Sequence, residues 1–199
     1  MKHRVITINR MYGSNGRLIG KALAEKLGIA FYDQELIHLA SEKKDIPVEE
    51  FQKVDEKCVS IWRYPSNSEI QMREQYHYFP INNVLFEAQS EIIRSIAASE
   101  DCVIVGRCAN DVLGNDCLSV FIYAPVEDRI KTIMDRLGRE ERSAKSLVRK
   151  MDKQRRSYYE YFTDHSWLDM TQYDLCINSS KFSSDQIVEM LAAKYQLLP

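Results

Sequence analysis

The chain alternates short apolar runs with longer amphipathic stretches, which is the pattern of a parallel sheet covered by helices. Five runs are too short for helices, and they predict buried strands at Val5–Ile8, Ile29–Tyr32, Cys102–Val105, Ser119–Tyr123 and Asp174–Asn178. After the first run, Ile19, Leu23 and Leu27 recur at helical spacing, and Gly28 stands where a C-terminal cap belongs. The chain therefore opens with a predicted strand–loop–helix–strand unit.

Helical patterns fill most of the remaining chain. Segment 34–100 is predicted to be mostly helical, with breaks near Pro47, Pro65 and Pro80. Its last third carries an apolar stripe made of Val84, Leu85, Ala88, Ile92, Ile93 and Ile96. A further helix is predicted from Val126 to about Leu137, directly after Pro125. Ser183-x-x-Gln186 has the form of a capping box that opens the final helix.

Composition places this pattern in one α/β domain. The 199 residues are 45% hydrophobic and 28% charged, with 7 Gly and 5 Pro, which leaves little room for disordered linkers. The five cysteines form no C-x-x-C pair, so neither a disulfide framework nor a zinc site is predicted, and a reducing compartment fits. No signal-like region and no membrane-length apolar stretch occur. We therefore expect a cytoplasmic protein without membrane contact.

The turn between the first strand and the first helix has the composition of a phosphate loop. It reads Gly13-Ser14-Asn15-Gly16, followed by Arg17 in the first helical turn. Glycines allow the main-chain amides of such a turn to point inward, and the helix N-terminus adds partial positive charge. The alternative is that these glycines only make a tight turn, because a lone G-x-x-G is a weak motif.

The spacing of this loop departs from the standard phosphate-loop motif. That motif is G-x-x-x-x-G-K-[ST], and the chain contains neither Gly-Lys-Ser nor Gly-Lys-Thr. Aligned on the motif, Gly16 stands at the lysine position and Arg17 at the position of the magnesium-binding hydroxyl. Arg10 or Arg17 could replace the charge of the lysine, but an arginine cannot bind magnesium. No metal-ligating residues are predicted, since the histidines show no ligand spacing.

Asp33 permits a second interpretation of the same unit. It follows Gly13 by twenty residues, which is the approximate distance at which an acid meets the ribose in dinucleotide-binding folds. The glycine pattern is not G-x-G-x-x-G, however, and the arginine-rich second half favours phosphoryl transfer over hydride transfer. Capping of the next helix is the other role open to Asp33.

Segment 129–156 concentrates positive charge in an otherwise slightly acidic protein. It holds eleven Lys or Arg residues against four Asp or Glu, while the whole chain has a formal net charge of -2. A solvated helix with ion pairs is the ordinary explanation of such a run. The local surplus favours anion binding by Arg136, Arg139, Arg142 and Arg155, and nucleic acid is the weaker alternative.

Several segments resemble the cytidylate kinase-like family. They lie in order along nearly the whole chain: Ile6–Gly20, Phe31–Asp33, Val103–Arg107, Val120–Pro125, Asp152–Tyr159 and Tyr173–Ser180. The resemblance implies a three-layer α/β fold of the P-loop kinase type with a parallel central sheet, and ATP-dependent transfer of a phosphoryl group to CMP or dCMP. It also implies one domain with a core at about 1–33, 101–135 and 170–199, a helical NMP-binding insertion at about 34–100, and an arginine-rich lid at about 136–169.

The resemblance also assigns roles to individual residues. Arg10, Gly13, Ser14, Asn15, Gly16 and Arg17 would hold the ATP phosphates, with Mg²⁺ carried mainly by the nucleotide. Asp33 and Arg107 would bind the acceptor nucleotide. Arg17, Arg139, Arg142 and Arg155 are the candidates for contact with the transferring group.

Departures from the family pattern leave other functions open. Asn15 stands where the family usually has glycine, Met11 where it has glutamate, and Cys108 where an acid follows Gly-Arg. Cytidylate kinases themselves have the phosphate-loop lysine, which is absent here. The alternatives are a non-catalytic nucleotide sensor and a kinase for another small acceptor. The expected partner is a small nucleotide rather than nucleic acid, and a homo-oligomeric state stays open.

Overall fold

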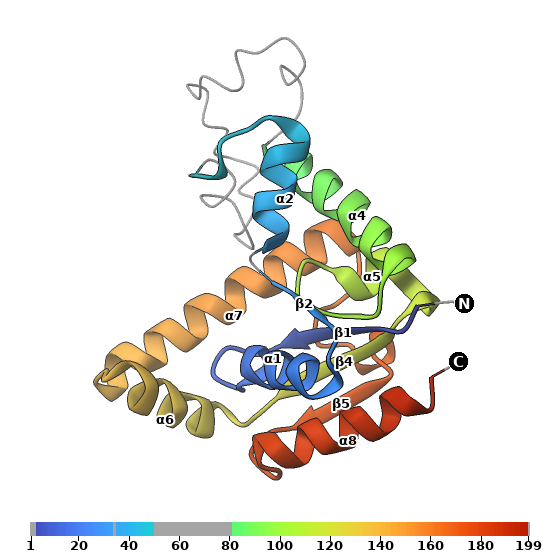
Figure 1. Ribbon diagram of the computed structural model, residues 1–199. Helices are drawn as coiled ribbons and strands as arrows, with labels where there is room; N and C mark the ends of the chain where they lie inside the picture. The colour runs from blue at the N-terminus through green and yellow to red at the C-terminus, as the bar shows by residue number, and fades with distance from the viewer. Residues whose placement is uncertain (1–2, 34, 50–80, 199) are drawn as a thin grey trace.

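The computed structural model describes residues 3–33, 35–49 and 81–198. Within these residues, five strands form one parallel sheet in the order β2-β3-β1-β4-β5 (Figure 1). The strands are β1 (Val5–Arg10), β2 (Ala30–Tyr32), β3 (Cys102–Val105), β4 (Leu118–Tyr123) and β5 (Leu175–Asn178). All five predicted strands and the predicted parallel sheet are thus confirmed.

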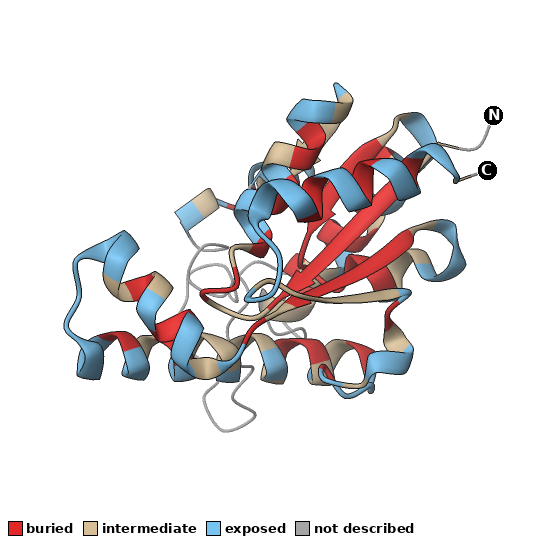
Figure 2. Ribbon diagram, turned by 90° about the horizontal axis from the view of Figure 1, so that it is seen from below, coloured by how far each residue is buried: buried red, intermediate tan, exposed pale blue. Residues whose placement is uncertain are grey.

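Helices cover both faces of the sheet and make three layers. Helices α1 (Gly16–Leu27) and α8 (Ser184–Gln196) lie together on one face. The other face is covered by α2 (Glu35–Lys44), α4 (Ile81–Ser99), α5 (Ala109–Leu113) and the C-terminal half of α7 (Glu141–Thr163). Figure 2 shows the strands buried between helices whose outer faces are exposed.

The alternation of side chains along each strand divides the core between these faces. Ile6 and Ile8 of β1 pack with α1 and α8, whereas Val5 packs with α2 and α4. The predicted apolar stripe between Val84 and Ile96 lies on α4 and packs into the same cluster as Val5 and α2. The three central strands β1, β3 and β4 are therefore buried on both faces, which explains why they read as continuous apolar runs.

Two predicted helix ends are confirmed in detail. Gly28 ends α1 in the left-handed conformation, with φ 67°, and its amide bonds back to the last turn. Ser183 and Gln186 form the reciprocal bonds of a capping box at the start of α8.

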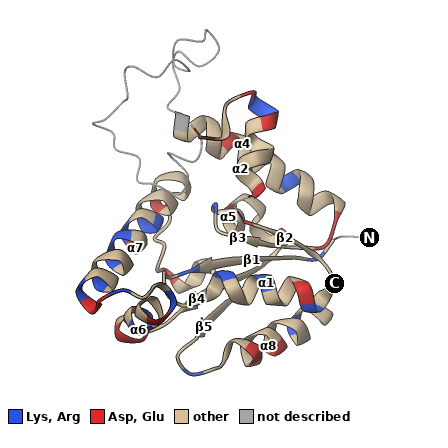
Figure 3. Ribbon diagram, turned by 60° about the vertical axis from the view of Figure 1, so that its left-hand side comes forward, with Lys and Arg blue, Asp and Glu red and all other residues tan. Residues whose placement is uncertain are grey.

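Helices α6 (Val126–Leu137) and α7 form an antiparallel hairpin that turns at Gly138. Ile130, Ile133, Ala144 and Val148 make its own small apolar core. Figure 3 shows that basic residues recur along both helices. The hairpin occupies most of the predicted lid, although the proposed boundaries of lid and insertion stay predictions, and the breaks predicted near Pro65 and Pro80 lie outside the described residues. No helix in the described part of the chain has the length and apolar character needed to cross a membrane.

Candidate phosphate-binding site

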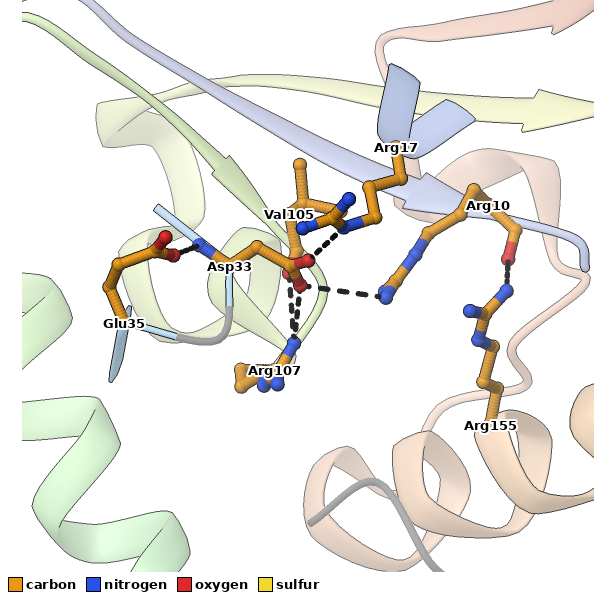
Figure 4. A network of polar contacts seen from close by, with 7 residues as sticks. All are labelled: Arg10, Arg17, Asp33, Glu35, Val105, Arg107 and Arg155. Carbon is orange, nitrogen blue, oxygen red and sulfur yellow. Dashed lines mark hydrogen bonds and ion pairs between the residues drawn. The ribbon is translucent and has the colours of Figure 1, made fainter. Parts of the chain in front are cut away.

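Four predicted site arginines gather at the carboxyl ends of the strands (Figure 4). Arg10 is the last residue of β1, Arg17 lies in the first turn of α1, Arg107 follows β3, and Arg155 belongs to α7. Carboxyl ends of parallel strands are where open α/β sheets bind ligands. The four arginines come from segments as far apart as residues 10 and 155, and only the fold brings them together.

Asp33, directly after β2, is the centre of this cluster. Its Oδ2 accepts a hydrogen bond from Arg17 Nε at 2.5 Å, and its Oδ1 accepts one from Arg107 Nη1 at 2.8 Å. Arg10 Nη2 lies 3.9 Å from the same Oδ1. Among the described residues of this cluster, one carboxylate faces three guanidinium groups, an arrangement that suits an anion.

The burial of these groups separates them into two kinds. The side chains of Asp33, Arg107 and Arg10 are only 4%, 2% and 7% exposed, whereas that of Arg17 is 50% exposed. The carboxylate of Asp33 contacts arginine side chains rather than the first turn of α2. In this structure Asp33 therefore does not cap α2, and its carboxylate is not free to accept a ribose hydroxyl. Arg10 and Arg107 are fixed parts of the site, and Arg17 is at its mouth.

The phosphate loop has the geometry that an anion-binding turn needs. Gly13 has φ +86° and Asn15 has φ 61°, both left-handed, and the first bond within α1 runs from Ile19 N–H to Asn15 O at 2.9 Å. The amides of Gly16 and Arg17 therefore precede the first intrahelical bond and have no acceptor within the helix. They lie where a helix N-terminus attracts negative charge.

Ser14 lies with its hydroxyl turned into the protein. The side chain is buried, and its Oγ lies 2.9 Å from Met11 O and 3.0 Å from Ile122 O. In this structure the hydroxyl fixes the loop to the end of β4. The Ser14 amide is also engaged, since it donates to Met11 O at 3.3 Å, so the assignment of Ser14 to the ATP phosphates stays a prediction.

Helices α6 and α7 hold the loop from the other side. Asp152 Oδ1 accepts the Tyr12 amide at 2.8 Å, while Arg129 Nη1 donates to Asp152 Oδ2 and to Tyr12 O. A Cβ atom at Gly13 would lie 2.7 Å from Arg129 O, so the loop packs directly on the α6 main chain. The Arg129–Asp152 pair thus clamps the loop between the two helices of the hairpin.

Arg155 approaches the same loop from α7. Its Nη1 donates to Arg10 O at 3.1 Å, and its guanidinium lies 5.4 Å from the centre of the Tyr12 ring. Arg136 lies over the same ring at 5.9 Å. Asp152, three residues before Arg155 on the same helix, bonds to Tyr12 and Arg129.

The turn that carries Arg107 is conformationally strained. Gly106, Arg107 and Cys108 have φ values of 81°, 55° and 54°, three left-handed residues in succession. Left-handed conformations are costly for residues other than glycine, and they persist where the surrounding structure imposes them. Here the turn aims the Arg107 guanidinium at Asp33, while Cys108 is buried among aromatic rings.

A narrow pocket lies beside the cluster. Its lining consists of Asn9, Arg10, Arg107, Cys108, Arg155, Tyr158, Tyr159 and Trp167. Tyr158, Tyr159 and Trp167 are also buried in the apolar cluster with Phe121. Asn9 Nδ2 donates to Asn110 Oδ1 at 2.7 Å, and Asn110 Nδ2 donates to Tyr159 at 2.9 Å. This chain of bonds ties α7 to β1 behind the pocket.

Arg139 and Arg142 lie elsewhere. Both are exposed at the turn of the α6–α7 hairpin, and Arg139 Nη1 donates to Ser143 Oγ at 3.0 Å. The structure therefore does not bring these two predicted residues to Asp33. Their assignment to the transferring group stays a prediction.

Sequence reasoning did not identify the Arg129–Asp152 clamp as part of the site. Arg129 is buried, and its Nε also donates to Ala124 O at 2.9 Å. From the sequence alone, a buried and fully paired arginine in a basic segment cannot be distinguished from the solvated arginines beside it. The only signal was its place on the apolar side of α6, next to Ile130 and Ile133.

The described residues around the loop offer no cluster of metal ligands. Within residues 3–33, 35–49 and 81–198, no group of three or more His, Cys, Asp or Glu side chains could hold one. Asp33, the carboxylate beside the loop, is already engaged by arginines.

The fold and the loop define a class of protein, and solved structures agree on that class. A parallel sheet with a phosphate loop after β1 is the arrangement of P-loop kinases. Shikimate kinase from Bacteroides thetaiotaomicron has this fold, with a TM-score of 0.55 at 16% identity over 97% of this chain and 98% of that one. An uncharacterized protein from Eubacterium ventriosum is similar with a TM-score of 0.72 and 27% identity, over 98% and 99% of the two chains.

Within that class, the chain belongs to the cytidylate kinase-like family, whose model matches residues 5–181. The cytidylate kinase of Archaeoglobus fulgidus is 26% identical over 190 residues, which cover 94% of this chain and 91% of that protein. The cytidylate kinase of Pyrococcus horikoshii is 27% identical over 192 residues, covering 95% and 86%.

Proposed function

We propose that the protein transfers the γ-phosphoryl group of ATP to a pyrimidine nucleoside monophosphate such as CMP or dCMP. The observation that carries the proposal is the surplus of arginines around Asp33, placed beside a phosphate loop at the carboxyl ends of the strands. Membership of the family and the two cytidylate kinase relatives support the choice of acceptor.

Phosphoryl transfer requires in-line positioning and positive charge rather than a covalent nucleophile. In the proposal, the amides of Gly16 and Arg17 hold the donor phosphates together with the side chains of Arg10 and Arg17. Arg107, fixed by its strained turn, binds the acceptor phosphate. Arg155 stabilises the charge on the transferring group from the opposite wall of the pocket.

The donor set around the loop does not fit a protein-held Mg²⁺. Arg17 occupies the position of the usual hydroxyl ligand, and Asp33 is engaged by guanidinium groups. In the proposal Mg²⁺ arrives on the nucleotide phosphates with its own waters, and no step is assigned to a metal bound by side chains.

A second candidate is a nucleotide sensor that binds without turnover. The specific observation in its favour is that Gly16 replaces the lysine, while Arg17 Nε is already bonded to Asp33 at 2.5 Å. This bond engages one of the five N–H donors of Arg17 with an acid of the protein itself. A kinase for another acceptor is the third candidate, favoured by Cys108 in place of the acid that follows Gly-Arg in the family.

An ADP-release assay across CMP, dCMP, UMP, AMP and shikimate, combined with calorimetry of ATP binding, separates these candidates. Turnover with CMP or dCMP supports the proposed activity, and turnover with another acceptor alone replaces it. ATP binding without turnover across the whole panel supports the sensor. Binding of a nicotinamide cofactor without ATP binding would overturn the kinase assignment altogether.

A further inference from the structure

Gly16 is a glycine for a reason different from that of Gly13. Gly13 has a left-handed main chain, which favours glycine directly, but Gly16 lies in the regular first turn of α1. A Cβ atom at Gly16 would lie 2.5 Å from Arg10 Cβ and 3.2 Å from Arg10 Cγ, far closer than carbon atoms approach. The stem of Arg10 therefore occupies the space that any side chain at position 16 would need.

The path of Arg10 explains this crowding. Ile6, Ile8 and Arg10 alternate along β1 toward the face that α1 covers. The Arg10 side chain then passes the start of α1 and extends toward Asp33, with Nη2 3.9 Å from Oδ1 (Figure 4). It is only 7% exposed, so its guanidinium is held in one place before any ligand arrives.

Alignment with the standard phosphate-loop motif suggests a function for the contact between Arg10 and Gly16. Counting G-x-x-x-x-G-K-[ST] along the loop puts Arg10 at the first glycine and Gly16 at the lysine. A glycine and a cation have thus exchanged positions. In the standard motif the first glycine leaves room for a lysine that starts from the helix and reaches the phosphates.

We infer that Arg10 supplies, from the end of β1, the positive charge that a helix lysine supplies in the standard loop, and that Gly16 is retained because Arg10 fills the lysine's space. Arg17 is the competing residue for this role, but it is half-exposed and bonded through Nε to Asp33. The steric part of the inference stands on the contact alone. The electrostatic part rests on the proposed function, because it needs a bound nucleotide phosphate.

Thermal unfolding tests the steric part. Gly16→Ala should lower Tm in the wild-type background but raise it in an Arg10→Gly background, where the nearest remaining side-chain atom is Ile122 Cβ at 3.4 Å and alanine favours the helix. In an Arg10→Ala background the clash with Cβ persists, so Gly16→Ala should still lower Tm. Gly20→Ala is the matched control: its Cβ would crowd Ile8 and Val105 at 3.0 and 3.1 Å, so Arg10→Gly should not rescue it.

The direction of the Tm change caused by Gly16→Ala tests the steric part of the inference. A rise in Tm in the wild-type background, or an equal fall in all three backgrounds, overturns the steric exchange. Because each comparison uses one background throughout, the intrinsic effect of changing Arg10 cancels.

Calorimetry of ATP binding tests the electrostatic part. Both Arg10→Gly and Arg10→Ala should weaken ATP binding at least about tenfold, as expected for loss of a charge-assisted hydrogen bond. Adding Gly16→Lys to Arg10→Gly rebuilds the standard arrangement and should recover most of that loss. Gly16→Lys alone should lower Tm and gain no affinity, since Arg10 still fills the space.

These outcomes also separate the inference from the proposed function. Unchanged ATP affinity in both Arg10 variants, or no recovery with Gly16→Lys, overturns the cationic role of Arg10 while leaving the kinase proposal intact. Absence of ATP binding by the wild-type protein overturns the proposed function and the cationic role together. The unfolding series still decides the steric exchange in that case.

Discussion

The two ends of the central strands each carry one aspartate surrounded by basic groups, yet the two clusters are built differently. At the carboxyl ends, Asp33 faces Arg10, Arg17 and Arg107. At the amino ends, Asp101 faces the Arg4 amide at 2.8 Å, the Arg4 guanidinium at 3.5 Å and the Tyr195 hydroxyl. Neutral donors thus satisfy much of Asp101, whereas the contacts described for the carboxylate of Asp33 come from arginines.

This difference separates a structural contact from a binding site. Asp101 ties β1, β3 and α8 together, and the Arg4 guanidinium also lies 4.6 Å from the centre of the Tyr195 ring. Its charges are balanced, so it attracts nothing further. Among the described residues, the Asp33 cluster sets three guanidinium groups against one carboxylate, next to the start of a helix whose first amides have no intrahelical acceptor. An excess of arginines over acids among the described residues, rather than the presence of ion pairs, distinguishes the end of the sheet that carries the candidate site.

Removing the acid from the functional end should have the largest effect on stability. Asp33→Asn removes the carboxylate that Arg10, Arg17 and Arg107 share, and the free energy of unfolding should fall by about 3–5 kcal/mol. Because loss of the carboxylate favours anion binding, added phosphate should raise the urea midpoint more in this variant than in the wild-type protein. Urea unfolding with and without phosphate measures both effects. A loss below about 1 kcal/mol, with no response to phosphate, would show that the cluster is not electrostatically coupled.

Arg155→Ala should lower turnover much more than it weakens nucleotide binding. If Arg155 acts on the transferring group, kcat should fall by about 10²–10³-fold while the Kd for ATP changes by less than about threefold. Arg156→Ala is the matched control, because Arg156 is the next residue of α7, half-exposed, and pairs with Glu160 at 4.0 Å. An equal loss of turnover and affinity would make Arg155 an ordinary binding residue.

Arg17→Ala should weaken ATP binding by about 1.5–3 kcal/mol, the size of a hydrogen bond to a charged group. The effect is expected to be smaller than a buried arginine would give, because the Arg17 side chain is 50% exposed. Lys21→Ala, one turn further along α1 in an exposed pair with Glu25, is the control. Calorimetry of ATP binding that finds the same affinity in Arg17→Ala and the wild-type protein would remove Arg17 from the site.

Local patterns predicted the fold and the position of the phosphate loop well. The runs that became β1, β3 and β4 are buried on both faces, so their composition alone identified them. The helix caps at Gly28 and Ser183 are formed by hydrogen bonds to residues a few positions away, so they could be predicted from the sequence.

The contacts within the site could not be predicted in the same way. Asp152 bonds to an amide 140 residues away, and Arg107 to an acid 74 residues away, so neither partner follows from spacing. Arg139 and Arg142 share the basic composition of Arg155, yet they lie at the exposed turn of the hairpin. Composition identified the basic segment, and only packing decided which of its arginines reach the loop.

Asp101→Asn should have the smallest of these effects, and its response to phosphate gives a contrast with Asp33→Asn. Burial opposes ionisation of Asp101, but hydrogen bonds from Tyr195, the Arg4 amide and His3, together with the Arg4 charge, lower the pKa of this carboxyl. Because the pKa of Asp101 is lower in the folded protein, the ionised carboxylate stabilises the fold at pH values above the pKa in the unfolded chain, which is about 3.9. This contribution is lost as the pH falls through the pKa of the folded protein. At neutral pH the variant should therefore lose about 1 kcal/mol, and in acid its urea midpoint should converge with that of the wild-type protein. Phosphate should not restore the difference, because the partners of Asp101 include neutral donors; a phosphate response equal to that of Asp33→Asn would mean that the two clusters do not differ in charge balance.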